Sequence, residues 1–201
     1  MNMIGSKIAV RVSKKYNDEV TFGNGDKLYL DVTFNPEHHV TICGEVVALP
    51  RGKWCKDTRG DFLAQELVVG DKVYFNYLTV DKDNLIFGED DIYTCSLEDV
   101  FCKVDGTGIT AISNHVLIEP EMTDEMIGSI YLGQPKMSET EGYVRFVSTP
   151  KKNKEELLTP GDHVMFHERY AFLNTIEEIK FYIMRQDDVL GKIKEHSGRP
   201  V

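Results

Sequence analysis

Two stretches decide the fold: Gly70-Asp71-Lys72-Val73-Tyr74-Phe75 near the middle of the chain, and Gly161-Asp162-His163-Val164-Met165-Phe166 near its end. Each is followed by a second shared motif, which begins at Tyr93 in the first case and at Tyr182 in the second. Two motifs that recur in the same order indicate two copies of one structural unit.

Subtracting the positions of matching residues aligns the two copies. Val10 matches Val116 with an offset of 106, and Gly44 matches Gly142 with an offset of 98. The offset shrinks along the chain, and the changes fall between the motifs, where loops tolerate insertions. We therefore expect one domain at residues 1–105 and a second at 109–201, joined by a short linker.

The motifs have the character of β-strands. They are short, rich in β-branched and aromatic residues, and they alternate in part. The Gly-Asp pair that opens two of them is typical of a turn. Because no segment keeps a helical period over three turns, the sequence predicts an all-β protein made of two tandem, small, irregular β-barrels.

Composition limits the partners and the compartment. The chain has 201 residues and a net charge of −10, which argues against a nucleic-acid partner. No apolar stretch approaches the roughly 20 residues of a membrane span. The four cysteines form no CxxC pair and no signal peptide is recognised, so we expect a cytoplasmic protein with reduced thiols.

Each copy resembles the GroES-type co-chaperonin subunit, the chaperonin-10 family. The resemblance rests on the Gly-Asp-x-Val-x-Phe motif and on the closing motif that begins at Tyr93 and Tyr182. Copy two adds Gly128-Ser129-Ile130-Tyr131-Leu132 and Glu141-Gly142-Tyr143-Val144. The four motifs run through almost the whole chain, and two copies in one chain are similar to tandem co-chaperonins.

The resemblance implies a fold and a function. The fold is a small irregular GroES-like β-barrel, which in the family carries a mobile loop and a roof hairpin. The function is that of a co-chaperonin, a chaperone that caps an ATP-loaded chaperonin ring of the GroEL type and assists the folding of an enclosed non-native polypeptide. It also implies a homo-oligomeric ring, no cofactor and no enzymatic activity, in the cytoplasm of a bacterial or phage-infected host cell.

The mobile loops are where the chaperonin would bind. In copy two the loop spans 121–141, and the resemblance assigns docking to its apolar centre, Ile130, Tyr131 and Leu132; a plain barrel strand is the alternative. In copy one the corresponding residues are Leu28, Tyr29 and Leu30. Two interpretations of this segment are possible, a second docking element or an ordinary hairpin. The roof hairpin is expected at 50–62 in copy one, whereas 150–156 in copy two is too short for one.

Sequence alone indicates no catalytic or metal site. His38 and His39 are adjacent and would point to opposite faces of a strand, so they and Cys43 do not suggest a shared ion. Cys95 and Cys102 have no recognisable histidine base. The alternative function is a GroES-fold binding or structural protein without chaperonin activity, for example a phage-encoded component.

Overall fold

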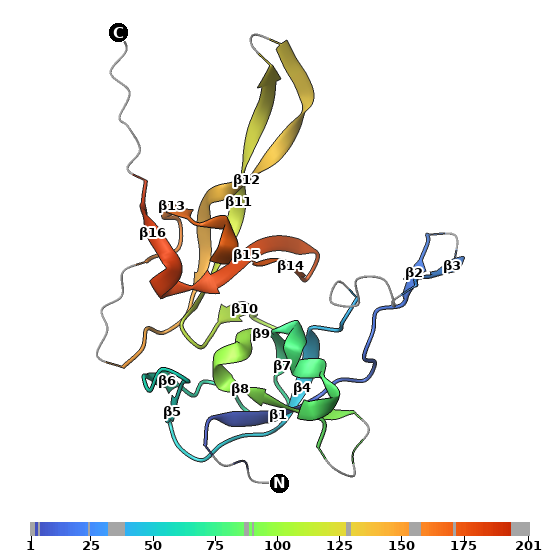
Figure 1. Ribbon diagram of the computed structural model, residues 1–201, viewed down its shortest axis with the longest axis vertical. Coiled ribbons are helices and arrows are strands. Elements are labelled where there is room, and N and C mark those ends of the chain that lie inside the picture. The colour runs from blue at the N-terminus through green and yellow to red at the C-terminus, as the bar shows by residue number, and fades with distance from the viewer. Residues whose placement is uncertain are drawn as a thin grey trace. The chain divides into compact units, whose positions relative to one another are not determined.

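The computed structural model is built of β-strands joined by turns and short 3-10 helices (Figure 1). It describes residues 3, 5–23, 25–31, 39–86, 89, 91–127, 130–152, 158–170 and 172–193. The chain divides into two compact units, unit 1 at residues 1–109 and unit 2 at 110–201. The described residues form helices of three or four residues, none of which could cross a membrane. The protein is therefore all-β, as the sequence predicts.

Unit 1 is organised around an antiparallel sheet with the strand order β10-β9-β7-β4-β1-β8. A small hairpin and a roof hairpin, each of two strands, lie outside this sheet. The strands of the sheet are β1 (Lys7–Arg11), β4 (Cys43–Ala48), β7 (Lys72–Phe75), β8 (Ile92–Ser96), β9 (Val100–Asp105) and β10 (Gly108–Ala111).

Unit 2 has a sheet with the order β14-β15-β11-β12-β13-β16. In reverse, five of these strands have the order β16-β13-β12-β11-β15, which corresponds to β9-β7-β4-β1-β8 in unit 1. The two units therefore share one topology over these five strands. The strands are β11 (His115–Ile127), β12 (Ile130–Val147), β13 (His163–Phe166), β14 (Phe172–Ile176), β15 (Ile179–Arg185) and β16 (Val189–Lys192).

The register of the strands corrects one part of the sequence alignment. Val10 lies opposite Tyr93, and Ile118 lies opposite Tyr182, so the structural equivalent of Val10 is Ile118 and not Val116. Val116 is buried as well and lies on the same face of its strand two residues earlier. A slip of two residues preserves the inward and outward alternation of a strand, which is why the apolar pattern did not exclude it.

The Gly-Asp turn is built in the same way in both units. Gly70 and Gly161 adopt positive φ angles of 98° and 95°, a conformation that favours glycine. Their amides donate to the carbonyls of Val46 and Val144, at 2.8 Å in each case. The Gly-Asp motif thus provides the backbone conformation of the turn that precedes β7 in unit 1 and β13 in unit 2.

The aspartate of each turn is tied to a lysine of the last strand. Asp162 Oδ2 accepts hydrogen bonds from the Thr159 amide at 2.6 Å and the Thr159 hydroxyl at 3.0 Å, and it pairs with Lys192 at 2.6 Å. Asp71 makes the equivalent ion pair with Lys103 at 3.7 Å. In unit 1 this ion pair joins the turn before β7 to β9, and in unit 2 it joins the turn before β13 to β16.

The cores of the two units use matching positions. In unit 1 the equivalent residues Val10, Val46, Val73 and Phe75 are buried. The core of unit 2 is formed by Val116, Ile118, Val144, Leu158, Val164, Phe166, Tyr182 and Met184. The alternation of buried and exposed residues along the strands therefore places one apolar layer inside each unit.

A hairpin is present in unit 1 where the roof hairpin was expected, and it extends two residues beyond the expected 50–62. Strands β5 (Trp54–Lys56) and β6 (Phe62–Ala64) pair antiparallel, and Trp54 lies opposite Ala64. In unit 2 most of the corresponding segment, residues 153–157, lies outside the described residues.

Candidate functional site: the two projecting hairpins

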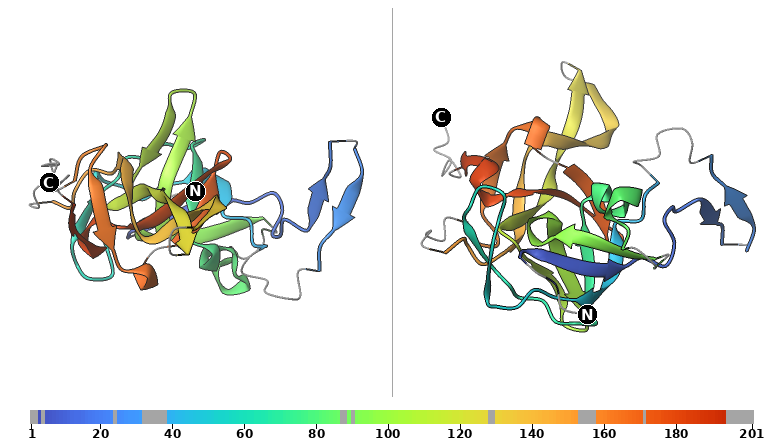
Figure 2. Two further views of the ribbon diagram at one scale, coloured as in Figure 1. Left: turned by 90° about the horizontal axis from the view of Figure 1, so that it is seen from above. Right: turned by 60° about the horizontal axis from the view of Figure 1, so that its bottom comes forward.

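The first hairpin belongs to unit 2 and is formed by the far ends of β11 and β12 (Figures 1 and 2). Within the sheet these strands pair as far as Pro120 and Gly142, and beyond it they pair from Met122 and Met137 to Ile127 and Ile130. One register shift lies between Pro120 and Met122, just before this second stretch, and another lies within it between Asp124 and Met126, so the hairpin bends away from the sheet through bulges.

The segment expected as a loop at 121–141 is thus strand-paired over most of its length. Tyr131 lies opposite Met126, and Ile130 lies opposite Ile127, next to the tip. Antiparallel pairing satisfies backbone groups that a loop would leave to water. Ile130, Tyr131 and Leu132 begin β12, but their side chains lie outside the description, so their docking role stays a prediction.

The second hairpin belongs to unit 1 and consists of β2 (Glu19–Thr21) and β3 (Lys27–Tyr29). Its turn is closed by the amide of Phe22, which donates to the carbonyl of Asp26 at 2.8 Å, with Gly25 at positive φ. The base is tied by an isolated bridge between Tyr16 and Val40. The segment is therefore a hairpin, and whether it also docks on a partner stays a prediction.

Apolar side chains of the unit 1 hairpin face solvent. Leu28 is 51% exposed, Tyr29 is 71% exposed and Phe22 is 52% exposed. Leu30 is half-buried, and its amide donates to the carbonyl of Asp18 at 2.7 Å. Sequence reasoning singled out Leu28, Tyr29 and Leu30 but missed Phe22, although an aromatic residue directly before a Gly-Asn-Gly-Asp turn was the available signal.

Ion pairs brace the stem of the same hairpin. Lys27 pairs with Glu19 across the two strands at 3.3 Å, and Lys14 pairs with Asp18 at 2.5 Å just before β2. The hydrogen bond between the side chains of Lys14 and Asp18 raises the pKa of Lys14 and lowers the pKa of Asp18. Such exposed pairs add little stability, so they orient the stem more than they hold it.

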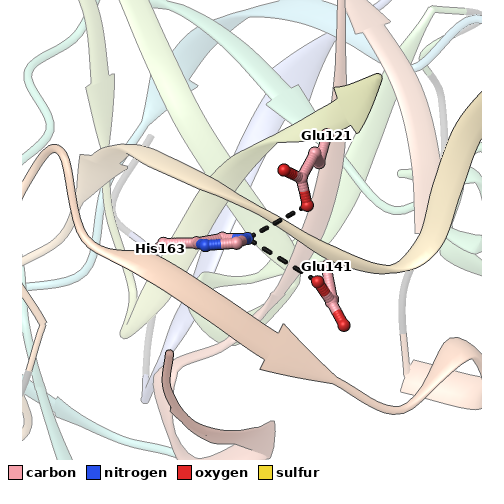
Figure 3. Close-up of side chains that lie close together, drawn as sticks. All are labelled: Glu121, Glu141 and His163. Atoms are coloured by element: carbon pink, nitrogen blue, oxygen red, sulfur yellow. Dashed lines mark hydrogen bonds and ion pairs between the residues drawn. The ribbon is translucent and has the colours of Figure 1, made fainter. Parts of the chain in front are cut away.

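A cluster of potential ligands lies at the base of the unit 2 hairpin (Figure 3). It comprises Glu121 of β11, Glu141 of β12 and His163 of β13. His163 Nε2 lies 3.2 Å from Glu121 Oε2 and 3.8 Å from Glu141 Oε2. No spacing in the sequence indicates this cluster, because its members meet through the bulged register of three strands.

The other residues weighed for chemistry are dispersed. His38 lies outside the described residues, and Cys43 is half-buried on β4. Cys95 and Cys102 are buried in unit 1. Burial raises the pKa of the Cys95 thiol to about 12, against a weaker opposing effect of its hydrogen bond with Thr79. A thiol with such a pKa is a poor nucleophile at neutral pH.

A comparison with models of protein families matches part of the chain. Residues 108–193 match the family model described as Chaperonin 10 Kd subunit. The matched region runs from β10 to the residue after β16 and so contains the whole sheet of unit 2 together with its projecting hairpin. A search of the curated proteins found no match to the chain.

Proposed function

We propose that this chain, whose residues 108–193 match the chaperonin-10 family, is a co-chaperonin that docks its projecting hairpins on the rim of a GroEL-type chaperonin ring. One observation carries the proposal beyond the family match. Each unit projects a hairpin from the same place in its topology, between β1 and β4 in unit 1 and between β11 and β12 in unit 2.

The exposed side chains of the unit 1 hairpin set the scale of docking. Full burial of a large apolar side chain is worth about 1.5–3 kcal/mol, and Phe22, Leu28 and Tyr29 have about half or more of their surface still to bury. Three such residues supply about 3–5 kcal/mol in total before ordering costs. Because a dissociation constant of 1 mM already corresponds to about 4 kcal/mol, a single hairpin binds weakly.

Weak single contacts become strong when several act together. Once one hairpin is bound, the others of the same assembly search for their sites at a high effective concentration. The pairing of β2 with β3 lowers the ordering cost, because it already restricts the backbone of the docking segment. A lid held by several weak contacts covers a non-native polypeptide and still leaves at the end of a cycle.

The sheet edges favour a homo-oligomeric ring. In unit 1, β9 is covered by β10, the segment that leads into unit 2. Its equivalent β16 is an edge strand of unit 2 in the part of the chain that the structure describes. We expect the segment that leads into β1 of a second chain to cover β16, which is a head-to-tail contact able to close a ring.

Binding to a purified GroEL-type ring tests the proposal. Wild-type chain is expected to associate with the ring in the presence of ATP and to dissociate without it. Leu28→Asp and Tyr29→Asp in unit 1, and Ile130→Asp and Leu132→Asp in unit 2, are each expected to weaken association at least about tenfold, because a carboxylate resists burial in an apolar groove.

Val69→Asp is the matched control. Val69 is 63% exposed and precedes the turn at Gly70, away from both hairpins in the sequence, so this variant is expected to bind like the wild type. Absence of any ATP-dependent association with a chaperonin ring would refute the co-chaperonin function. That result would favour the alternative, a binding or structural protein that uses the same fold.

A further inference from the structure

The cluster at the base of the unit 2 hairpin has an excess of negative charge. Two carboxylates, Glu121 and Glu141, approach one imidazole nitrogen of His163. Among the described residues, neither carboxylate has another charged partner. A neutral imidazole offers at most one N–H at this nitrogen, so it can donate to one of the two oxygens and leaves the other without a donor.

The three side chains are partly withdrawn from water. His163 is 15% exposed, Glu121 is 27% exposed and Glu141 is 37% exposed. Reduced hydration makes an uncompensated carboxylate more costly than it is at the surface. A cation held between the three donors would remove this cost.

The imidazole is already oriented for ligation. The ring of Tyr143 stacks on the ring of His163, with centroids 4.6 Å apart and planes inclined by 16°. Tyr143 and His163 are also directly opposite residues of β12 and β13. Strand pairing and ring stacking together point Nε2 toward the two carboxylates, as Figure 3 shows.

We propose that Glu121, Glu141 and His163 bind a divalent transition-metal ion, with Zn²⁺ as the best fit. Ligand atoms around a tetrahedral zinc with bonds of about 2.0–2.2 Å lie about 3.2–3.6 Å from each other. The three donor atoms all lie within 4.8 Å of one another, so rotation of the Glu141 side chain closes the remaining gap.

The donor set also selects the metal. Mg²⁺ and Ca²⁺ prefer all-oxygen sites, whereas one imidazole with two carboxylates suits zinc and its neighbours. Three protein ligands leave a fourth position for water or another group. Bound metal would join both limbs of the hairpin, β11 and β12, to the sheet strand β13, and so fix the base from which the hairpin projects.

Among the residues that the structure describes, unit 1 lacks the equivalent ligands. The strand register places Lys72 where unit 2 has His163, and Cys43 where it has Glu141. A lysine ammonium carries no lone pair for a metal and repels it by charge. The proposal therefore predicts one metal site per chain, located in unit 2.

Zinc titration of the full chain tests the proposal independently of any chaperonin. Chelator-treated protein in a reducing buffer is titrated with Zn²⁺ in competition with a colorimetric chelator. We expect one Zn²⁺ per chain, no displacement by millimolar Mg²⁺, and with Co²⁺ an absorption band typical of a four-coordinate site. Glu141→Gln and His163→Gln are expected to weaken Zn²⁺ binding at least about 100-fold.

Two matched variants exclude general effects of charge or of surface histidines. Glu139→Gln removes a nearby carboxylate that pairs with Lys136, and His167→Gln removes an exposed histidine of the same unit. Both are expected to bind Zn²⁺ like the wild type. Since Glu141→Gln conserves shape at a partly exposed position, it decides the test even if His163→Gln fails to fold. Absence of stoichiometric binding, or wild-type affinity in Glu141→Gln, would overturn the proposal.

Discussion

Gly142→Ala is expected to destabilise unit 2 strongly. A Cβ at this position would lie 2.4 Å from the Glu119 carbonyl oxygen and 2.7 Å from Ile118 Cγ2, both well inside contact distance. The oxygen belongs to the backbone of β11, whose pairing with β12 and β15 prevents it from moving away. Overpacking of this kind costs about 1–3 kcal/mol, and a clash with backbone belongs to the upper part of that range, about 2–3 kcal/mol.

Gly191→Ala provides the control. Gly191 lies in β16 of the same sheet, and a Cβ there meets nothing within 4 Å, so the change is expected to stay within about 0.5 kcal/mol of the wild type. Thermal or urea unfolding measures both variants. For a domain of this size about 4–8 °C of Tm corresponds to 1 kcal/mol, which predicts a fall of about 10–20 °C for Gly142→Ala.

The equivalent change in unit 1 tests the structural repeat itself. In Gly44→Ala the new Cβ would lie 2.6 Å from the Arg11 carbonyl oxygen, so a loss of similar size is expected in the unfolding of unit 1. If Gly142→Ala were no more destabilised than Gly191→Ala, the close approach of β11 and β12 and the reasoning from it would be wrong.

Two further predictions concern titratable groups. Burial alone would raise the pKa of Asp162, but hydrogen bonds from Lys192 and Thr159 outweigh it and hold the pKa below its ordinary value. Asp162 therefore stabilises unit 2 at pH values above about 4, the pKa of an unfolded aspartate, and this contribution is lost as the pH falls below 4. The variant Asp162→Ala is expected to lower the free energy of unfolding by about 1 kcal/mol at pH 7. It is also expected to flatten the acid side of a curve of stability against pH. Among the cysteines, a thiol reagent is expected to modify half-buried Cys43 first in native protein at pH 8. Cys95 is buried and its pKa is about 12, so it is expected to react only as fast as the protein unfolds. Mass spectrometry of labelled peptides measures both reactions, and early modification of Cys95 would contradict the prediction.

The sequence predicted those parts of the fold that depend on local backbone chemistry. The Gly-Asp turns at Gly70 and Gly161 need positive φ, and the alternating apolar residues after them need one buried face, so both could be recognised from residue types. The same property explains the misalignment of Val10 with Val116. Strand patterns repeat every two residues, and only the hydrogen-bonded register distinguishes Ile118 from Val116.

The candidate sites depended on features that residue types do not encode. The loop at 121–141 was expected from the family resemblance, but β11 and β12 extend through most of this segment. Glu121, Glu141 and His163 are distant in the sequence and converge because the bulge between Pro120 and Met122 shifts the pairing of the two strands. Predicting that cluster would have required the register of three strands in advance.

The two hairpins differ in how each is connected to its sheet, and this difference suggests different mechanical roles. In unit 2 the hairpin strands are continuations of β11 and β12, so its base shares the ladder of the sheet and carries the Glu121, Glu141 and His163 cluster. In unit 1 the hairpin has two three-residue strands that form a separate sheet. Short two-stranded ribbons are marginally stable by themselves, so the unit 1 hairpin can adapt to a partner surface while the unit 2 hairpin presents a fixed direction. The two units thus share their strand order, the Gly-Asp turn and the closely packed glycines Gly44 and Gly142, and they differ in their projecting hairpins.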